Sequence, residues 1–169
     1  RYRLKEYARM GARFAKWRAV MSIGQEIPSK NCMISNANAL ARYAALCQEF
    51  GLVPIVEPEV LMSGSHSSKT CYKVTREVLN IVFDQLYLHN IALEGIILKP
   101  NMILPGLDSG ENKTAEKIAE DTIKCLMECV PAAVPGIAFL SGGQFSQEAS
   151  ERLNAINEIS GSNSPWKLT

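Results

Sequence analysis

The sequence lacks the features of nucleic-acid-binding, membrane-spanning and disordered proteins. Its 18 Lys and Arg balance 17 Asp and Glu, and no basic run offers a footprint for nucleic acid or an anionic membrane. No apolar stretch approaches the roughly 18–20 residues that span a bilayer, and no signal-peptide pattern opens the chain. A hydrophobic content of 47% with balanced charge excludes intrinsic disorder. The 169 residues therefore predict one soluble globular domain without membrane or nucleic-acid partners.

Histidine is scarce and the cysteines form no paired pattern. The five cysteines are odd in number and scattered, which predicts free thiols in a reducing compartment and hence a cytoplasmic protein. Cys125 and Cys129 lie four residues apart in an expected helix, so we interpret them as core thiols on one face. Only His66 and His89 could complete a metal site, and both lie in settings typical of the surface. No metal cofactor is expected.

Strand-like and helix-like segments alternate along the chain. Strands are expected at 13–20, 52–57, 93–99, 136–141 and from 165, with helices at 1–10, 34–48, 69–89, 114–128 and 146–159. A strand roughly every 40 residues, with one helix between, predicts a parallel α/β sheet. A doubly wound sheet and part of a (β/α)₈ barrel both fit, since a full barrel takes about 250 residues. Both ends fall inside expected elements, so we expect residues 1–169 to be part of a single longer domain.

Charge interrupts three consecutive apolar strands. Side chains alternate between the two faces of a strand, so each expected strand places its charged residues on one face together with apolar ones. In the first strand, Lys16 and Arg18 share a face with Phe14, and in the second, Glu57 and Glu59 share a face with Val53 and Ile55. In the third, Lys99 shares a face with Leu93, Gly95 and Ile97. Each charge alone is typical of a solvated rim or a turn. Active sites of parallel α/β folds lie at the C-terminal strand ends, and buried charges are costly unless paired. Together the charges predict a functional site.

The residue types in this group suit amine catalysis. Apolar surroundings and a second cation, Lys16, would disfavour the charged form of Lys99. A free amine attacks carbonyl carbons to form a Schiff base. Glu57 or Glu59 could move the protons that the loss of water requires. The pattern is compatible with a lysine imine enzyme.

A glycine-rich turn follows the fourth expected strand. Ser141, Gly142 and Gly143 precede a helix, and such a turn offers backbone N–H groups to a phosphate. An ordinary strand–helix turn remains the alternative. The same string, LSGGQ, occurs in ABC-type ATPases, but the phosphate loop that such an enzyme needs is absent: residues 63–70 lack glycine at both required positions.

Several longer strings resemble class I fructose-1,6-bisphosphate aldolase. They are FAKWR at 14–18, LVPIVEPE at 52–59, LEGIILKPNM at 93–102 and FLSGGQ at 139–144, with shorter matches at 36–44 and 153–157. The match runs over essentially the whole chain, in order. The resemblance implies a (β/α)₈ barrel that reversibly cleaves fructose 1,6-bisphosphate into dihydroxyacetone phosphate and glyceraldehyde 3-phosphate in glycolysis and gluconeogenesis, without metal. It also suggests a cytoplasmic homotetramer.

The resemblance also implies roles for individual residues. Lys99 matches the Schiff-base lysine, Glu57 the proton-shuttling carboxylate, and Lys16 the lysine that supports carbinolamine formation. Arg18 and Glu59 line the same pocket, and Ser141 and Gly142, with Gly143 beside them, match the turn that holds one substrate phosphate.

The resemblance is incomplete. Relative to the family pattern, the chain begins just before the fourth barrel strand and stops inside the eighth, without the first-strand Asp that acts in carbon–carbon cleavage. Ser22 stands where many members have a lysine that contacts the other phosphate, which leaves that contact in doubt. A non-catalytic scaffold on an aldolase barrel, or another imine-forming lyase, therefore stays open. Preference between the bisphosphate and fructose 1-phosphate does not follow from the sequence.

Overall fold

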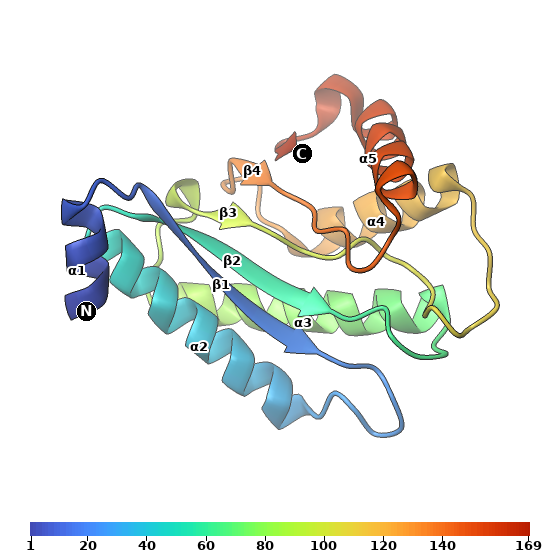
Figure 1. Cartoon of the computed structure of the whole chain (residues 1–169), viewed down its shortest axis with the longest axis horizontal. Helices are drawn as coiled ribbons and strands as arrows, with labels where there is room; N and C mark the ends of the chain where they lie inside the picture. The colour runs from blue at the N-terminus through green and yellow to red at the C-terminus, as the bar shows by residue number, and fades with distance from the viewer.

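The computed structural model describes residues 1–169 as one parallel sheet with helices between its strands (Figure 1). The strands are β1 (Phe14–Met21), β2 (Val53–Val60), β3 (Ile97–Leu98), β4 (Gly136–Ile137) and β5 (Lys167–Leu168). The helices are α1 (Tyr2–Arg9), α2 (Lys30–Glu49), α3 (Ser68–Leu88), α4 (Ala115–Cys129) and α5 (Ser146–Ser160), with short 3₁₀ turns η1 (Leu93–Gly95) and η2 (Gly161–Asn163). No helix is both long enough and apolar enough to cross a membrane.

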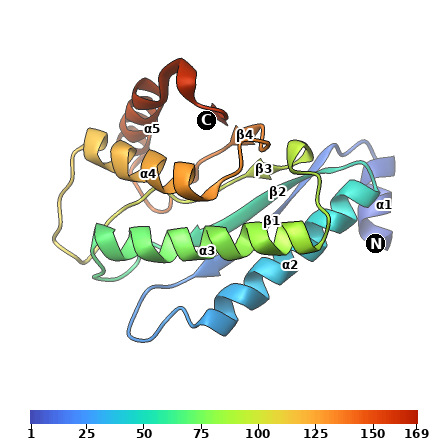
Figure 2. The same cartoon turned by 180° about the vertical axis from the view of Figure 1, so that it is seen from behind.

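The order of the strands decides between the two architectures that the sequence left open. Neighbouring strands are consecutive in the chain, β1-β2-β3-β4-β5, and every pair is parallel. A doubly wound sheet needs a reversal in strand order to place helices on both faces, and there is none. Seen from the two sides, α2, α3 and α4 cover one face of the sheet (Figures 1 and 2). The chain is therefore a segment of a singly wound barrel.

Local sequence explains where the three inner helices begin. The side chain of Ser29 accepts a hydrogen bond from the backbone N–H three residues later, and Ser67 and Thr114 do the same at α3 and α4. Each of these bonds satisfies one of the N–H groups that a helix start leaves free. The caps fix where each helix leaves the loop that follows a strand, so they set the positions of the loops at the C-terminal strand ends.

The main core lies between the sheet and its helices. Val56, Leu79, Leu86, Leu98 and Ile137 are fully buried in it, from two helical turns of α3 and three strands. Odd-numbered positions of β1 face this core, where Ala19 and Met21 are buried. Even-numbered positions face the other way and are exposed, Phe14 and Val20 among them. The uncovered face is thus available for polar chemistry.

Two strands are shorter than expected. Residues 93–95 form the turn η1, in which the N–H of Gly95 donates to the carbonyl of Ala92 at 3.1 Å, so the expectation that Leu93 and Gly95 share a strand face with Lys99 is wrong. β4 covers only two of the six residues expected at 136–141. Pairing with neighbouring strands, rather than apolar content, sets strand length, and each of these segments meets its neighbours over two residues.

The loops after β2 and β3 are joined to each other. Backbone N–H groups of Gly106, Leu107 and Asp108 donate to carbonyls of His66, Met62 and Gly64 at 2.8–2.9 Å. The contact is close enough that a Cβ on Gly106 would lie 2.2 Å from the Gly64 oxygen, so only glycine fits there. The expectation of a surface His66 is wrong, because both ring nitrogens are buried at this junction without a hydrogen-bond partner, and burial lowers the pKa of the imidazole.

All five cysteines are free, and four of them, including Cys125 and Cys129, are buried. Cys32 is exposed.

Candidate active site

The charged side chains of the first three strands meet on the uncovered face of the sheet. The register pairs Arg18 with Glu57, so β1 and β2 direct these side chains to the same side. Lys99 follows β3 directly, and its N–H donates to the carbonyl of Val56 at 2.8 Å, which continues the register by one residue. The structure thus brings together all five charged residues that the sequence singled out: Lys16, Arg18, Glu57, Glu59 and Lys99.

Glu57 lies at the centre of this group. Its side chain is 2% exposed, and Oε1 accepts a hydrogen bond from Lys99 Nζ at 2.6 Å. Oε2 lies 3.0 Å from Lys16 Nζ, a close ion pair whose geometry is too poor for a hydrogen bond. The sequence suggested two neighbouring lysines that repel each other. The structure instead places a carboxylate between them, which offsets their repulsion and gives one proton acceptor to both.

Two opposing influences act on the pKa of Glu57. Burial, the largest single influence, would raise it. The hydrogen bond from Lys99 and the positive charges of Lys99 and Lys16 together outweigh burial, so the pKa lies below its usual value. Glu57 is therefore ionised at neutral pH and able to accept a proton.

This lowered pKa predicts how stability changes in acid. Unfolding releases Glu57 to its ordinary pKa of about 4.3, so below that pH the unfolded chain binds a proton that the folded chain does not. The contribution of Glu57 is complete above that value and is lost as the pH falls through the folded-state pKa. Urea titrations between about pH 6 and pH 3 should therefore show a smaller loss of unfolding free energy in Glu57→Gln than in the wild type. Equal losses would contradict the assignment.

A second ion pair lies beside the first. Arg18 Nε donates to Glu59 Oε2 at 2.5 Å, with Glu59 buried and Arg18 half exposed. The buried carboxylate fixes one end of the guanidinium, so the remaining N–H groups of Arg18 are free to face the cleft.

These residues line an open cleft of about 660 Å³. Its far wall is the turn after β4, where Gly142 and Gly143 have φ of +62° and +101°, conformations that favour glycine. The backbone N–H groups of Ser141, Gly142 and Gly143 donate to no other backbone carbonyl. The cleft therefore has cations at one wall and free N–H donors at the other.

Sequence reasoning gave no role to four residues of the cleft, Leu61, Ser63, Phe139 and Leu140. Leu61 and Ser63 follow β2, Phe139 and Leu140 follow β4, and none of the four is a charged residue or a glycine. Ser22 is exposed just after β1 and does not line the cleft. No group of three or more His, Cys, Asp and Glu side chains is placed to hold a metal ion.

A barrel segment with Glu57, Glu59 and Lys99 towards the C-terminal ends of two strands, the two carboxylates paired with cations of neighbouring strands, has the architecture of a barrel enzyme's active-site face. The sequence profile of the family described as "Glycolytic: Fructose-bisphosphate aldolase class-I" matches residues 1–169. The chain belongs to this family, the class I fructose-bisphosphate aldolases.

Relatives agree in both sequence and structure. The chain is 53% identical over 169 residues to "Probable fructose-bisphosphate aldolase class 1" of Xanthomonas axonopodis pv. citri, all of this chain and 50% of that one. It is 53% identical over 167 residues to "Fructose-bisphosphate aldolase 4, cytosolic" of Arabidopsis thaliana, 99% of this chain and 42% of the relative. A Plasmodium falciparum fructose-bisphosphate aldolase, solved with TRAP and a small-molecule inhibitor, superposes with a TM-score of 0.96 at 45% identity, over 99% of this chain and 48% of its own. The chain spans about half the length of the curated relatives that it matches.

Proposed function

We propose that residues 1–169 form the Schiff-base half of a single (β/α)₈ aldolase domain, which reversibly cleaves fructose 1,6-bisphosphate into dihydroxyacetone phosphate and glyceraldehyde 3-phosphate. The observation that carries the proposal is the buried Glu57 carboxylate, which contacts Lys99 at 2.6 Å and Lys16 at 3.0 Å inside the cleft. Imine formation needs an amine beside a group that both accepts and donates protons.

The geometry supports a definite order of proton movements. Glu57 accepts the proton that Lys99 must lose before its nitrogen attacks the ketone carbon of the sugar. Attack leaves a positive charge on the nitrogen and a negative charge on the oxygen, and a proton that the nitrogen loses passes to the oxygen to give the neutral carbinolamine. Protonation of that hydroxyl by Glu57 then lets it leave as water, and the nitrogen lone pair forms the iminium bond. Lys16, on the other carboxylate oxygen, stabilises the ionised form of Glu57 between these steps.

We propose that one substrate phosphate lies against the turn at Ser141, Gly142 and Gly143. Their free N–H groups are donors of the kind that phosphate oxygens accept. Arg18 and Glu59 then line the wall between the phosphate and the imine. No metal takes part in the proposed chemistry. By analogy with the plant relatives whose names say cytosolic, we propose a cytoplasmic enzyme, and by family resemblance a homotetramer.

The direct test is chemical trapping on the polypeptide that carries residues 1–169 in its host. Incubation with dihydroxyacetone phosphate and borohydride should reduce the imine to a stable secondary amine, and peptide mass mapping should place it on Lys99. An adduct on another residue would overturn the assignment of Lys99. Absence of any adduct, together with absence of turnover, would favour a non-catalytic scaffold.

One residue beneath the glycine turn gives a prediction about phosphate binding. The Gln144 amide donates to the carbonyl of Ser141 at 2.7 Å and accepts from Arg152 Nη1 at 2.7 Å, so it holds the turn from below. Gln144→Met keeps the volume but removes both bonds. We expect KM for the bisphosphate to rise about tenfold with kcat within about twofold, the effect of about 1–2 kcal/mol of lost binding.

The matched control for this prediction is Gln147→Met. Gln147 lies on the exposed side of α5, where its amide contacts only Glu151. Steady-state kinetics should show no change in KM for this variant, and equal effects in the two variants would contradict the role given to Gln144.

A further inference from the structure

The backbone pairing between β2 and β3 ends where the proposed chemistry begins. The register joins Val56 to Leu98, and the N–H of Lys99 makes the last backbone bond between the two segments, to Val56. The next residue of β2 that faces this neighbour is Pro58, which has no N–H to donate, and Pro100 faces the β4 side, where its carbonyl accepts from the N–H of Leu140 at 3.4 Å. Glu57 and Lys99 therefore face each other at the open end of a ladder.

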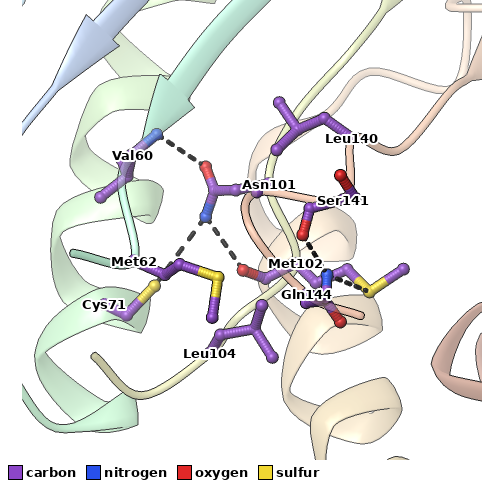
Figure 3. Close-up of a pocket in the computed structure, with 10 residues that line it drawn as sticks. Val60, Met62, Cys71, Asn101, Met102, Leu104, Leu140, Ser141 and Gln144 are labelled. Atoms are coloured by element: carbon purple, nitrogen blue, oxygen red, sulfur yellow. Dashed lines mark hydrogen bonds between the residues drawn. The ribbon is translucent and has the colours of Figure 1, made fainter. Parts of the chain in front are cut away.

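A buried amide bridges the gap that Pro58 leaves. The Asn101 side chain is 5% exposed, and its Oδ1 accepts a hydrogen bond from the N–H of Val60 at 3.0 Å (Figure 3). Val60 is the last residue of β2, three positions after Glu57, and Asn101 lies two positions after Lys99. The amide thus ties the two strand ends together just beyond the ion pair.

The amide itself is held on its other side. Asn101 Nδ2 donates to Thr75 Oγ1 of α3 at 3.1 Å and to the carbonyl of Met102 at 3.1 Å, with Cys71 Sγ at 3.8 Å. Both amide protons and the acceptor oxygen are occupied, which fixes the orientation of the group. A buried and fully satisfied amide of this kind rigidifies the segments that it joins.

From this we infer that Asn101 is a positioning residue that sets the separation of Lys99 and Glu57 by replacing the missing backbone ladder between their strands. This inference rests on the proposed function. Asn101 does not line the cleft and is not offered as a catalytic residue. Because proton transfer between Glu57 and the reacting nitrogen depends on their separation, loosening the strand ends should slow imine formation more than it weakens substrate binding.

The test compares three variants in the polypeptide that carries residues 1–169. Asn101→Leu keeps the approximate shape and removes every hydrogen bond of the amide. Thr75→Val removes one contact and leaves the bridge to Val60. Thr122→Val is the matched control, since Thr122 is a buried helix threonine whose hydroxyl accepts from the N–H of Ile103 at 3.0 Å, farther along the same loop.

Per folded molecule, we expect Asn101→Leu to lower kcat and the single-turnover rate of borohydride trapping by about 10- to 100-fold, with KM within about threefold. Thr75→Val should show a smaller loss of the same kind, about two- to fivefold, and it keeps the test possible where Asn101→Leu does not fold. Thr122→Val should lower stability while leaving kcat unchanged. Unchanged kcat in both Asn101→Leu and Thr75→Val, or an equal loss in Thr122→Val, would overturn the inference.

A structural readout separates this inference from the proposed function. In a crystal structure of Asn101→Leu, or of Thr75→Val, the distance from Lys99 Nζ to Glu57 Oε1 should increase from its present 2.6 Å. An unchanged distance overturns the role of Asn101 even if the wild type forms the imine. Conversely, a wild type that forms no imine refutes the proposed function, while the distance still reports whether Asn101 positions the pair.

Discussion

Replacement of Lys99 by arginine is expected to lower turnover of fructose 1,6-bisphosphate by at least about 10⁴-fold, the size of effect seen when a covalent nucleophile is removed. Arginine keeps a positive charge opposite Glu57, whose side chain is 2% exposed, so the carboxylate retains a partner. A guanidinium is always protonated and does not attack a ketone. The variant should therefore fold, pair with Glu57 and form no imine.

Two measurements are needed to read this result. Borohydride trapping followed by mass mapping should give no adduct, and urea unfolding should show that Lys99→Arg is nearly as stable as the wild type. Lys99→Met is the comparison, because it leaves Glu57 with only the more exposed Lys16 and should be the less stable of the two. Turnover within tenfold of the wild type in Lys99→Arg would refute a Schiff base at this position.

Glu57→Gln is expected to lower kcat by about 10²–10⁴-fold, the usual contribution of a general acid–base group. The amide keeps the shape of the side chain but neither accepts nor releases a proton at neutral pH. Imine formation and its hydrolysis should both slow, while KM changes little. Single-turnover trapping of the Lys99 adduct measures the first of these steps, and release of product measures the second.

Glu59→Gln is the matched comparison. Both glutamates are buried on one face of β2, and Glu59 contacts Arg18 rather than a lysine. If Glu57 is the proton carrier, Glu59→Gln should slow borohydride trapping at Lys99 much less than Glu57→Gln does. Equal effects would mean that the buried charge pattern, rather than proton transfer at one atom, limits the reaction.

Much of the fold follows from periodicity in the sequence. The apolar period of 34–48 and the apolar run of 52–57 predict α2 and β2 because each buries one face or both faces against its neighbours. The shortened β3 did not follow from this reasoning. Its apolar run includes the turn at Leu93–Gly95, and the end of its pairing depends on Pro58 in another strand, which is information that no single segment contains.

The residue types of the site could be predicted from the sequence, but their arrangement could not. Charge within apolar strands marked Lys16, Glu57 and Lys99, because buried charge needs an explanation. That Glu57 separates the lysines depends on the register of three strands, which spacing within one strand does not determine. Asn101 and Gln144 lie within the strings that resemble the family, but the sequence assigns them no role, since an amide in an apolar context becomes informative only when its partners are known.

The junction between the loops after β2 and β3 has a consequence for which part of the cleft rim can move. Three backbone bonds join these loops, and no side chain fits at Gly106, so neither loop can swing outward alone. That rim of the cleft is therefore held in a fixed position. Within this part of the barrel, we expect any movement of the rim to lie at the turn after β4, where Ser141, Gly142 and Gly143 donate no backbone bond to a neighbouring loop.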